Sequence, residues 1–194
     1  MFAADLTAEF ADRALRDGLT VLIGSGSTAA ANLGGLVDEL RQVDDSPVVV
    51  ILTEGARRFV TAATVRHLGR CPVLTDETTT GWSHQPLHVW LTDVASRVLV
   101  YPASAGFLGR TAAGCATDLA STTLLCATGL PVLLVPSMHR RMWTNPLVRR
   151  NVSLLRQAGF DVLDVVDGLA PPVELVVAAL PGRPIPLRTQ EAAS

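Results

Sequence analysis

The sequence predicts an α/β fold: a single-domain, doubly wound (Rossmann-like) parallel sheet, arranged as a flavodoxin-like three-layer sandwich. Three observations support it. Short apolar runs alternate with helix-like segments along the chain, which is typical of parallel sheets with helices on both faces. The run Pro47–Leu52 is apolar throughout, as expected of a strand covered on both faces. The 194 residues suffice for one domain with a core and are too few for two ordinary domains.

The first half of the chain alternates regularly between helical and extended patterns. Residues 1–18 carry apolar side chains at helical spacing between charges and end at Gly18, which indicates an amphipathic helix. The elements expected after it are a strand at Thr20–Ile23, a loop of small residues from Gly24, a helix at Ala29–Gln42, the strand Pro47–Leu52, a helix at Ala56–Ala63, a strand at Cys71–Leu74 and a polar loop at 75–85.

The organising stretch of the second half is residues 98–143. Two apolar strands, Val98–Tyr101 and Pro131–Val135, each end at a proline, and a helix of small residues lies between them. The loops that follow them, Pro102–Phe107 and Pro136–Trp143, should border one site, because ligands of open parallel sheets bind at the carboxyl ends of strands. The remaining expected elements are helices at Pro86–Ala95, Asn145–Ala158 and Glu174–Leu180 and a strand at Phe160–Val165.

Composition and charge limit the classes of binding partner that we expect for this protein. The formal charge of −2 gives no general electrostatic reason to expect nucleic acid or an anionic membrane. No apolar run approaches the roughly 20 residues of a membrane span, and Asp5, Glu9 and Asp12 interrupt any apolar signal segment. We therefore expect a cytoplasmic protein. Its three scattered cysteines form neither a disulfide framework nor a CxxC pair.

Two sequence motifs follow the paired strands. Residues 102–107 read PASAGF, residues 136–143 read PSMHRRMW, and His88 opens the helix before the first of these strands. With these motifs the sequence resembles the homo-oligomeric flavin-containing cysteine decarboxylases, whose signatures are PASANT and PxMNxxMW. That family includes phosphopantothenoylcysteine decarboxylases and the peptidyl-cysteine decarboxylases of lantibiotic, linaridin and thioamitide pathways. Further matches are Gly24–Ser27, TEGARRF at Thr53–Phe59 and TDLASTTLLCAT at Thr117–Thr128, so the resemblance covers about residues 20–165.

The resemblance implies a bound flavin, FMN with FAD as the alternative. The Gly24–Ser27 loop would hold the flavin phosphate, Thr53 would add a hydroxyl, and Phe59 would pack on the isoalloxazine ring. The expected cofactor contacts are Gly24, Ser25, Gly26, Ser27, Thr53, Phe59, Pro102, Ala103, Ser104, Ala105, Asp118, Ser121, Thr122 and Met138. The chain would then comprise an N-terminal helix at 1–18, a flavoprotein domain at 19–180 and a C-terminal tail at 181–194.

The resemblance also implies a catalytic histidine and a substrate-covering loop. His88 matches the family's essential histidine. Its unperturbed pKa of about 6.5 suits the removal of a thiol proton. The expected substrate contacts are Gly106, Phe107, His139, Arg140, Met142 and Trp143. We expect no metal site.

Departures from the family pattern bear on the substrate. Gly106 and Phe107 replace the asparagine and threonine of PASANT, and His139 replaces the asparagine that engages the substrate carboxylate in the family. His139 with Arg140 or Arg141 could take over that role. Phosphopantothenoylcysteine decarboxylases use a cysteine near the C-terminus, whereas this chain has none after Cys126.

The expected function is therefore flavin-dependent oxidative decarboxylation of a C-terminal cysteine of a ribosomal precursor peptide to an enethiol. Alternatives are a phosphopantothenoylcysteine decarboxylase-like enzyme of coenzyme A synthesis and a non-catalytic flavin-binding subunit. An NAD-dependent oxidoreductase is a further alternative, because residues 24–29 fit GxGxxA. A flavin prenyltransferase on a related fold is a weaker one. Expected partners are the precursor peptide, further copies in a trimer or dodecamer, and other modification enzymes of the pathway.

Overall fold

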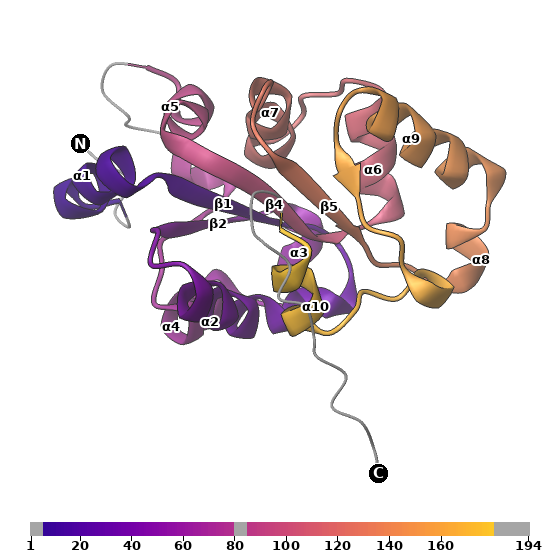
Figure 1. The fold of residues 1–194 in the computed structure, drawn as a ribbon, viewed down its shortest axis with the longest axis horizontal. Helices are drawn as coiled ribbons and strands as arrows, with labels where there is room; N and C mark the ends of the chain where they lie inside the picture. The colour runs from indigo at the N-terminus through magenta and orange to yellow at the C-terminus, as the bar shows by residue number, and fades with distance from the viewer. Residues whose placement is uncertain (1–5, 80–84, 181–194) are drawn as a thin grey trace, which may run out of the picture.

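A six-stranded parallel sheet forms the centre of the computed structural model, which describes residues 6–79 and 85–180. Its strand order is β3-β2-β1-β4-β5-β6, and all five neighbouring pairs are parallel (Figure 1). The strands are β1 Leu19–Gly24, β2 Val48–Leu52, β3 Val73–Leu74, β4 Ala95–Ala103, β5 Val132–Pro136 and β6 Asp161–Val162. Strands are added on one side of β1 as far as β3 and on its other side from β4 to β6, so the strand order reverses between β1 and β4. Ligands of such folds bind at this switch point. The doubly wound parallel sheet is thus confirmed.

Helices cover both faces of this sheet (Figure 1). The α-helices are α1 Ala8–Asp17, α2 Leu33–Val43, α3 Glu54–Arg57, α4 Ala62–Gly69, α5 Leu87–Val94, α6 Ala105–Ala112, α7 Leu119–Cys126, α8 Arg140–Trp143, α9 Pro146–Gln157 and α10 Val173–Ala178. The 3₁₀ turns are η1 Thr28–Asn32, η2 Asp76–Thr79 and η3 Val166–Gly168. Helices α1, α5, α6, α7 and α9 pack on one face, and α2, α4 and α10 pack on the other.

The strands divide their side chains between two apolar cores. In β1, Val21 and Ile23 belong to the core under α5 and α7, whereas Leu22 belongs to the core under α2. All three side chains are fully buried, and burial of each aliphatic side chain contributes about 1.5–3 kcal/mol. Helix α1 joins the first core through Ala11 and Ala14.

Several predicted helix boundaries were wrong, because the chain is divided into shorter elements than its sequence pattern indicates. The helix expected at Ala56–Ala63 is two helices, since Thr53 caps α3 and Thr61 caps α4. The helix expected from Ala29 begins with the 3₁₀ turn η1 before α2. The tail expected at 181–194 lies outside the described residues.

The two loops expected after the paired strands also contain regular structure. Strand β4 continues through Ala103, and the hydroxyl of Ser104 then caps α6. His139 caps the short helix α8 within the second motif. The single small-residue helix expected between the strands is divided into α6 and α7, with Gly114 at a positive φ of 68° between them.

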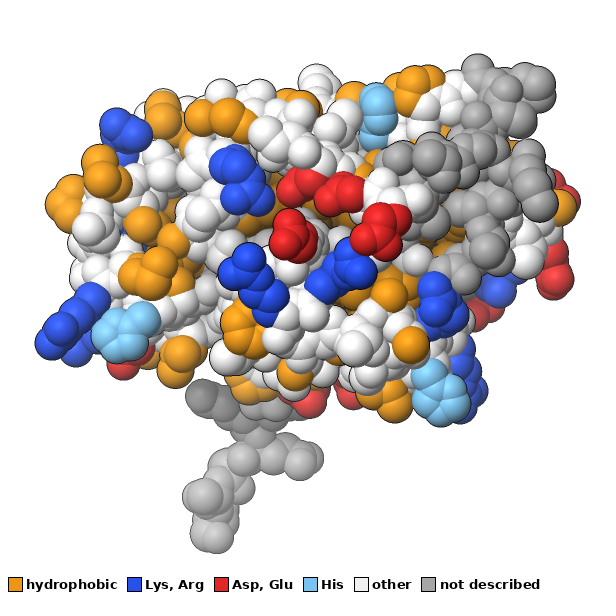
Figure 2. Space-filling model, turned by 180° about the vertical axis from the view of Figure 1, so that it is seen from behind, with side chains coloured by type: hydrophobic (Ala, Val, Ile, Leu, Met, Phe, Trp, Pro, Cys, Tyr) orange, Lys and Arg blue, Asp and Glu red, His pale blue; other side chains and the backbone are white. Residues whose placement is uncertain are grey.

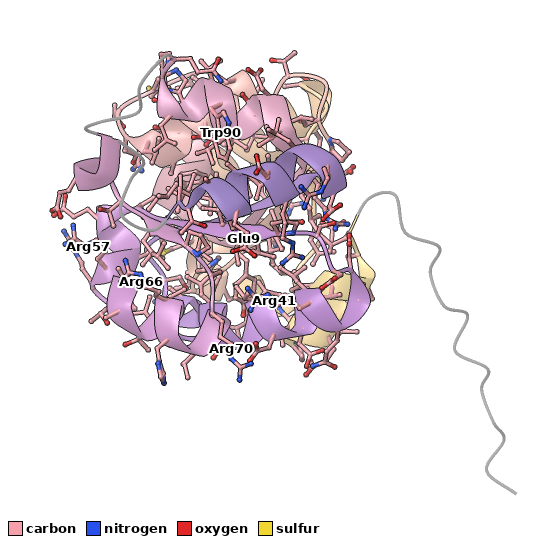
Figure 3. The ribbon with its side chains drawn as sticks, turned by 90° about the vertical axis from the view of Figure 1, so that its left-hand side faces the viewer. Glu9, Arg41, Arg57, Arg66, Arg70 and Trp90 are labelled. Carbon is pink, nitrogen blue, oxygen red and sulfur yellow. The ribbon has the colours of Figure 1, made fainter. Side chains whose placement is uncertain are left out.

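An arginine on α2 is hydrogen-bonded to the end of α4, just before β3 (Figure 3). The guanidinium of Arg41 on α2 donates to the carbonyls of Gly69 and Arg70 where α4 ends. Gly34 on α2 faces the same helix: a Cβ added there would lie 2.7 Å from Cβ of Leu68. Glycine at position 34 therefore permits the close approach of the two helices.

The adjacent pair Gly34 and Gly35 gives a matched prediction. Gly35 is exposed on α2, and a Cβ added there meets no atom within 4 Å. Gly35→Ala should raise the free energy of unfolding by about 0.5–1 kcal/mol, because alanine restricts the unfolded chain. Gly34→Ala should lower it, because the methyl group overlaps Leu68. Urea unfolding of both variants measures the two effects, and equal shifts would contradict this packing.

Candidate functional site

Loops at the carboxyl ends of β1 and β4 are joined by a buried serine. The hydroxyl of Ser25 donates to the carbonyl of Pro102 at 2.8 Å and accepts from the backbone N–H of Ser104, also at 2.8 Å. It lies 3.1 Å from the Ser104 hydroxyl. Ser25 is 1% exposed, so these contacts form in a setting where an unpaired polar group is costly. The switch point is therefore a fixed structure.

The ends of β2 and β5 are attached to the same β1 loop. Thr53 donates its hydroxyl to the carbonyl of Gly24 at 3.1 Å, and the Ser27 and Ser137 hydroxyls lie 2.8 Å apart. Gly26 meets Gly55 backbone to backbone: a Cβ on Gly26 would lie 3.3 Å from Cα of Gly55. Glycine is needed on both sides of this contact. The ends of β2, β4 and β5 are thus all attached to the loop that follows β1.

The Ser25→Ala variant tests this connection. Removal of the hydroxyl leaves the Ser104 N–H without the partner that it has in the wild type. A buried group left unpaired costs about 1–3 kcal/mol, so the urea midpoint should fall accordingly. Ser46→Ala serves as a control, because the Ser46 hydroxyl bonds to Asp44 away from these strand ends. An unchanged midpoint for Ser25→Ala would contradict the assigned role.

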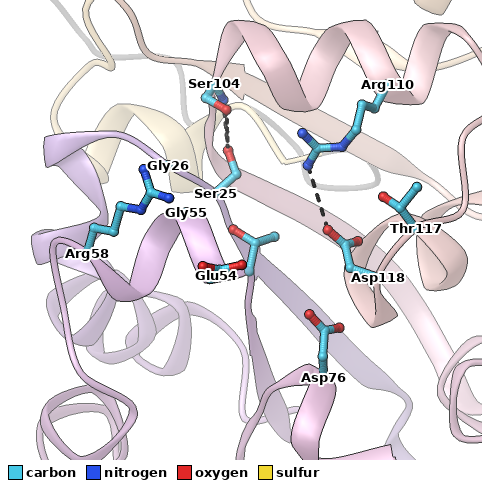
Figure 4. Close-up of a pocket in the computed structure, with 11 residues that line it drawn as sticks. Ser25, Gly26, Glu54, Gly55, Arg58, Asp76, Ser104, Arg110, Thr117 and Asp118 are labelled. Atoms are coloured by element: carbon cyan, nitrogen blue, oxygen red, sulfur yellow. Dashed lines mark hydrogen bonds and ion pairs between the residues drawn. The ribbon is translucent and has the colours of Figure 1, made fainter.

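A polar cavity of about 430 Å³ opens between these loops (Figure 4). It is lined by Ser25, Gly26, Thr53, Glu54, Gly55, Arg58, Asp76, Ser104, Arg110, Thr117 and Asp118. Its charged groups have both signs, and Figure 2 shows acidic side chains gathered between basic ones on the side of the molecule that it displays. A ligand here meets hydroxyls and charges on every side.

Two of the carboxylates in this cavity are held by α7. Asp118 caps α7 by accepting from the N–H of Ser121 at 2.7 Å, and its other oxygen lies 3.6 Å from the Arg110 guanidinium. Asp76 accepts from the N–H of Leu119 at 2.7 Å. These bonds satisfy the first turn of the helix and fix the positions of both carboxylates.

A second cavity of about 510 Å³ adjoins the first and has a more apolar lining. It is lined by Gly26, Ser27, Thr28, Ser104, Ala105, Gly106, Ser137, Met138, His139, Met142 and Leu169. Gly26 and Ser104 line both cavities. The His139 Nδ1 accepts from the N–H of Arg141 at 3.2 Å, which leaves Nε2 for a ligand.

The structure brings many of the predicted site residues to these cavities. Those that line one or both are Ser25, Gly26, Ser27, Thr53, Ser104, Ala105, Gly106, Asp118, Met138, His139 and Met142. The two loops expected to border one site therefore do so.

Other predicted site residues are placed elsewhere. The side chains of Ala103 and Phe107 are buried in the core, because Phe107 points inward from the first turn of α6. Arg140 pairs with Asp167 at 3.1 Å, and Trp143 is buried beneath Arg149. The remaining members that line neither cavity among the described residues are Gly24, Phe59, Pro102, Ser121, Thr122 and His88. Phe59 is 44% exposed, and Ser121 and Thr122 bond to Asp118.

His88 lies at the start of α5 and is half-buried. Its carbonyl accepts from the Thr92 hydroxyl at 3.0 Å. Helix α5 packs against α7, and within the described residues His88 lines neither of the two cavities.

Sequence reasoning missed several lining residues. Glu54, Gly55, Arg58, Thr117 and Ser137 lie inside segments that carry the family resemblance, so a closer inspection of those segments could have found them. Asp76, Arg110 and Leu169 carry no such signal, because only the packing of η2, α6 and the η3 segment brings them to the cavities.

The lining fits the flavin that the resemblance implies. Ala105, Gly106 and Met138 offer an apolar surface for a flat ring system. Ser25, Ser27 and the glycine at position 26 offer hydroxyls and open backbone for a phosphate. Both kinds of surface meet at Gly26 and Ser104, so one ligand with an apolar ring and a polar tail can contact both.

Two further findings come from the residues that the structure describes. Among residues 6–79 and 85–180, no helix combines the length and the apolar character that a membrane crossing requires. In the same residues, burial raises the pKa of the Tyr101 phenol above its ordinary value, against the effect of a hydrogen bond with the Asn32 side chain. Tyr101 therefore stays neutral beside the first motif.

A known protein family matches most of the chain. The family described as Flavoprotein matches residues 12–183. The chain is 42% identical over 151 residues to the coenzyme A biosynthesis bifunctional protein CoaBC of Mycobacterium tuberculosis, with 76% of this chain and 35% of that protein covered. The chain thus spans about a third of the length of the curated relatives it matches.

Solved structures give a similar result. The FMN-dependent cysteine decarboxylase TvaF from thioviridamide biosynthesis is 32% identical, with a TM-score of 0.69 and coverage of 75% of this chain and 89% of that one. MrsD from a Bacillus species is 25% identical, with a TM-score of 0.75 and coverage of 87% and 96%.

Proposed function

Because the chain belongs to the flavoprotein family, we propose that it is an FMN-dependent decarboxylase of a C-terminal peptidyl cysteine, with FAD as the alternative cofactor. The observation that carries this proposal is the pair of adjoining cavities that share Gly26 and Ser104 at the switch point. The likeness to TvaF supports the same reaction class. The product would be a peptide ending in an enethiol.

The reaction needs an electron acceptor, because a cysteine carboxylate cannot leave unless its electrons have a destination. The bound flavin would supply the two-electron oxidation of the cysteine side chain. With the thiol proton taken by a base, that oxidation would give a thioaldehyde whose C=S bond lies β to the carboxylate. That bond takes up the electron pair as CO2 leaves, and protonation of sulfur yields the enethiol.

The chain's own residues would orient the reactants. Ser25, Ser27 and Gly26 would hold the cofactor, and Met138 with Met142 would cover the apolar side and exclude water. His139 would direct its free Nε2 toward the substrate from the cap of α8. Thr53 contributes by fixing the Gly24 carbonyl, so its hydroxyl would position the loop.

We propose His88 as the base that takes the thiol proton. It lines neither cavity within the described part of this chain, so a second copy would have to bring it there. The family resemblance implies a homo-oligomer, a trimer or dodecamer, with flavin near subunit contacts. The precursor peptide would then bind between copies, where other modification enzymes of the pathway could deliver it.

Phosphopantothenoylcysteine, the decarboxylase substrate of coenzyme A synthesis, is the second candidate substrate. The 42% identity to CoaBC favours it, whereas the 32% identity to TvaF, an FMN-dependent cysteine decarboxylase from thioviridamide biosynthesis, favours the peptide. The two substrates share the cysteine carboxylate and thiol and differ in what is attached to the cysteine nitrogen. Activity measured on each substrate separately therefore distinguishes the two candidates.

The test incubates purified, FMN-loaded protein with a peptide ending in cysteine, and separately with phosphopantothenoylcysteine. We expect the peptide mass to fall by one CO2 and two hydrogens, and the same peptide with a C-terminal amide to stay unchanged. Reaction of phosphopantothenoylcysteine alone would support the coenzyme A branch. Bound flavin with no reaction of either substrate would support a non-catalytic flavin-binding subunit.

A further inference from the structure

Gly106 and Phe107, the two residues of the first motif that depart from the family pattern, both lie next to the side chain of Arg110. An added Cβ on Gly106 would have a single neighbour within 4 Å, the Nη1 of Arg110 at 3.8 Å. The Arg110 guanidinium also lies over the Phe107 ring, 5.9 Å from its centroid. Arg110 is one helical turn after Gly106 on α6, so the helix itself places the guanidinium beside the space that a larger side chain would fill.

Arg110 also stands between the two cavities. It lines the polar cavity, whereas Gly106 beside it lines the apolar one. Figure 4 shows its guanidinium directed from α6 toward Asp118, with the 3.6 Å ion pair drawn between them. The Arg110 side chain is 43% exposed and that of Asp118 is 15% exposed, so the cation can be reached by a ligand while its counter-ion is largely covered.

We infer that Arg110 binds an oxyanion of a ligand where the two cavities meet. This inference rests on the proposed function and names the residue that supplies positive charge to that site. A guanidinium binds carboxylate or phosphate through two parallel N–H donors. The anion is the carboxylate of the substrate cysteine or the phosphate of the flavin, and both have the same recognition chemistry.

Of the two arginines that line the polar cavity, Arg58 and Arg110, Arg110 is the one beside Gly106 of the apolar cavity. Arg140, expected from the sequence to bind the substrate carboxylate, pairs with Asp167 and lines neither cavity. Arg58 lines the polar cavity from the end of α3, on the wall opposite α6 (Figure 4). Asp76 and Asp118 each accept a hydrogen bond from a backbone N–H in the first turn of α7. These bonds partly compensate the negative charge of the two carboxylates, so they repel an incoming anion less.

Binding measurements on Arg110→Met test the inference and identify the anion. The flavin arm compares FMN with riboflavin, which lacks the phosphate. The substrate arm uses FMN-loaded protein and a peptide ending in serine, which cannot be oxidised through a thiol, as free acid and as amide. We expect the variant to weaken one anionic ligand about tenfold, the lower end for a charged hydrogen bond at a half-exposed group, while the matching neutral ligand is unaffected. Loss in the FMN arm assigns phosphate, and loss in the acid arm assigns carboxylate.

Controls separate charge from folding. Arg13→Met removes a guanidinium of the same exposure, 42%, that also pairs with an aspartate, and it should change neither arm. Arg110→Lys keeps the charge without the paired donors and should fall between wild type and Arg110→Met. Wild-type protein that binds FMN and the acid peptide, with Arg110→Met binding both equally well, would overturn the inference. Wild-type protein that binds no flavin would instead contradict the proposed function.

Discussion

Replacement of His88 by asparagine should leave flavin bound and lower the decarboxylation rate by about 10²–10⁴-fold, the usual contribution of a general base. Asparagine keeps a polar group at the start of α5 and can accept a hydrogen bond, yet it cannot take a proton near neutral pH. The flavin contacts proposed above come from the β1, β4 and β5 loops, so absorbance of the bound cofactor should be unchanged. Mass spectrometry of the C-terminal-cysteine peptide measures the loss.

The control for this prediction is His67→Asn on the exposed surface of α4, which should keep full activity. A mixed oligomer adds a second comparison. If another copy supplies the imidazole, His88→Asn chains combined with chains that cannot bind flavin should recover part of the activity that neither variant has alone. Full activity of His88→Asn by itself would remove His88 from the mechanism.

Substitution of Gly26 by valine should abolish tight flavin binding and leave the sheet folded. A Cβ at this position already lies 3.3 Å from the Gly55 backbone, which cannot swing aside as a side chain could. Gly26 also lines both cavities, so the larger side chain would occupy ligand space directly. Overpacking of this kind costs about 1–3 kcal/mol, which corresponds to about 5- to 160-fold in the flavin dissociation constant. Fluorescence titration with FMN measures it.

Gly35→Ala is the matched glycine control, because position 35 is open to solvent on α2. It should bind flavin as the wild type does. Circular dichroism of Gly26→Val should match that of the wild type, since the change lies in a surface-accessible loop beyond β1. Unaltered FMN affinity in Gly26→Val would place the cofactor away from the β1 loop.

The fold was predictable because its strands carry their own signal. A strand buried on both faces is apolar at every position, as in Val48–Leu52, and the alternation with helices then leaves few topologies. Helix boundaries were less predictable, because they depend on single capping hydroxyls such as those of Thr53 and Thr61. In the sequence, a threonine that caps a helix cannot be told from a threonine inside one, because the difference lies in which backbone N–H its hydroxyl binds.

The lining of the two cavities was predictable where it consists of contiguous loops. Gly26, Ser104 and Met138 lie in segments that follow strands directly, so the sheet edge places them. Arg110 and Asp76 reach the cavity from a helix and a 3₁₀ turn, and nothing in their local sequence marks the direction of their side chains. Phe107 shows the converse, because helix α6 turns it into the core although it belongs to the motif.

The central step of the proposed reaction is the two-electron oxidation of a C-terminal cysteine by a flavin bound at the β1–β4 switch point. An anaerobic titration tests it directly. One equivalent of a peptide ending in cysteine, added to FMN-loaded protein without oxygen, should bleach the visible flavin absorbance and release CO2, whereas the same peptide ending in serine should do neither. Flavin that stays oxidised in the presence of excess cysteine peptide would contradict this step.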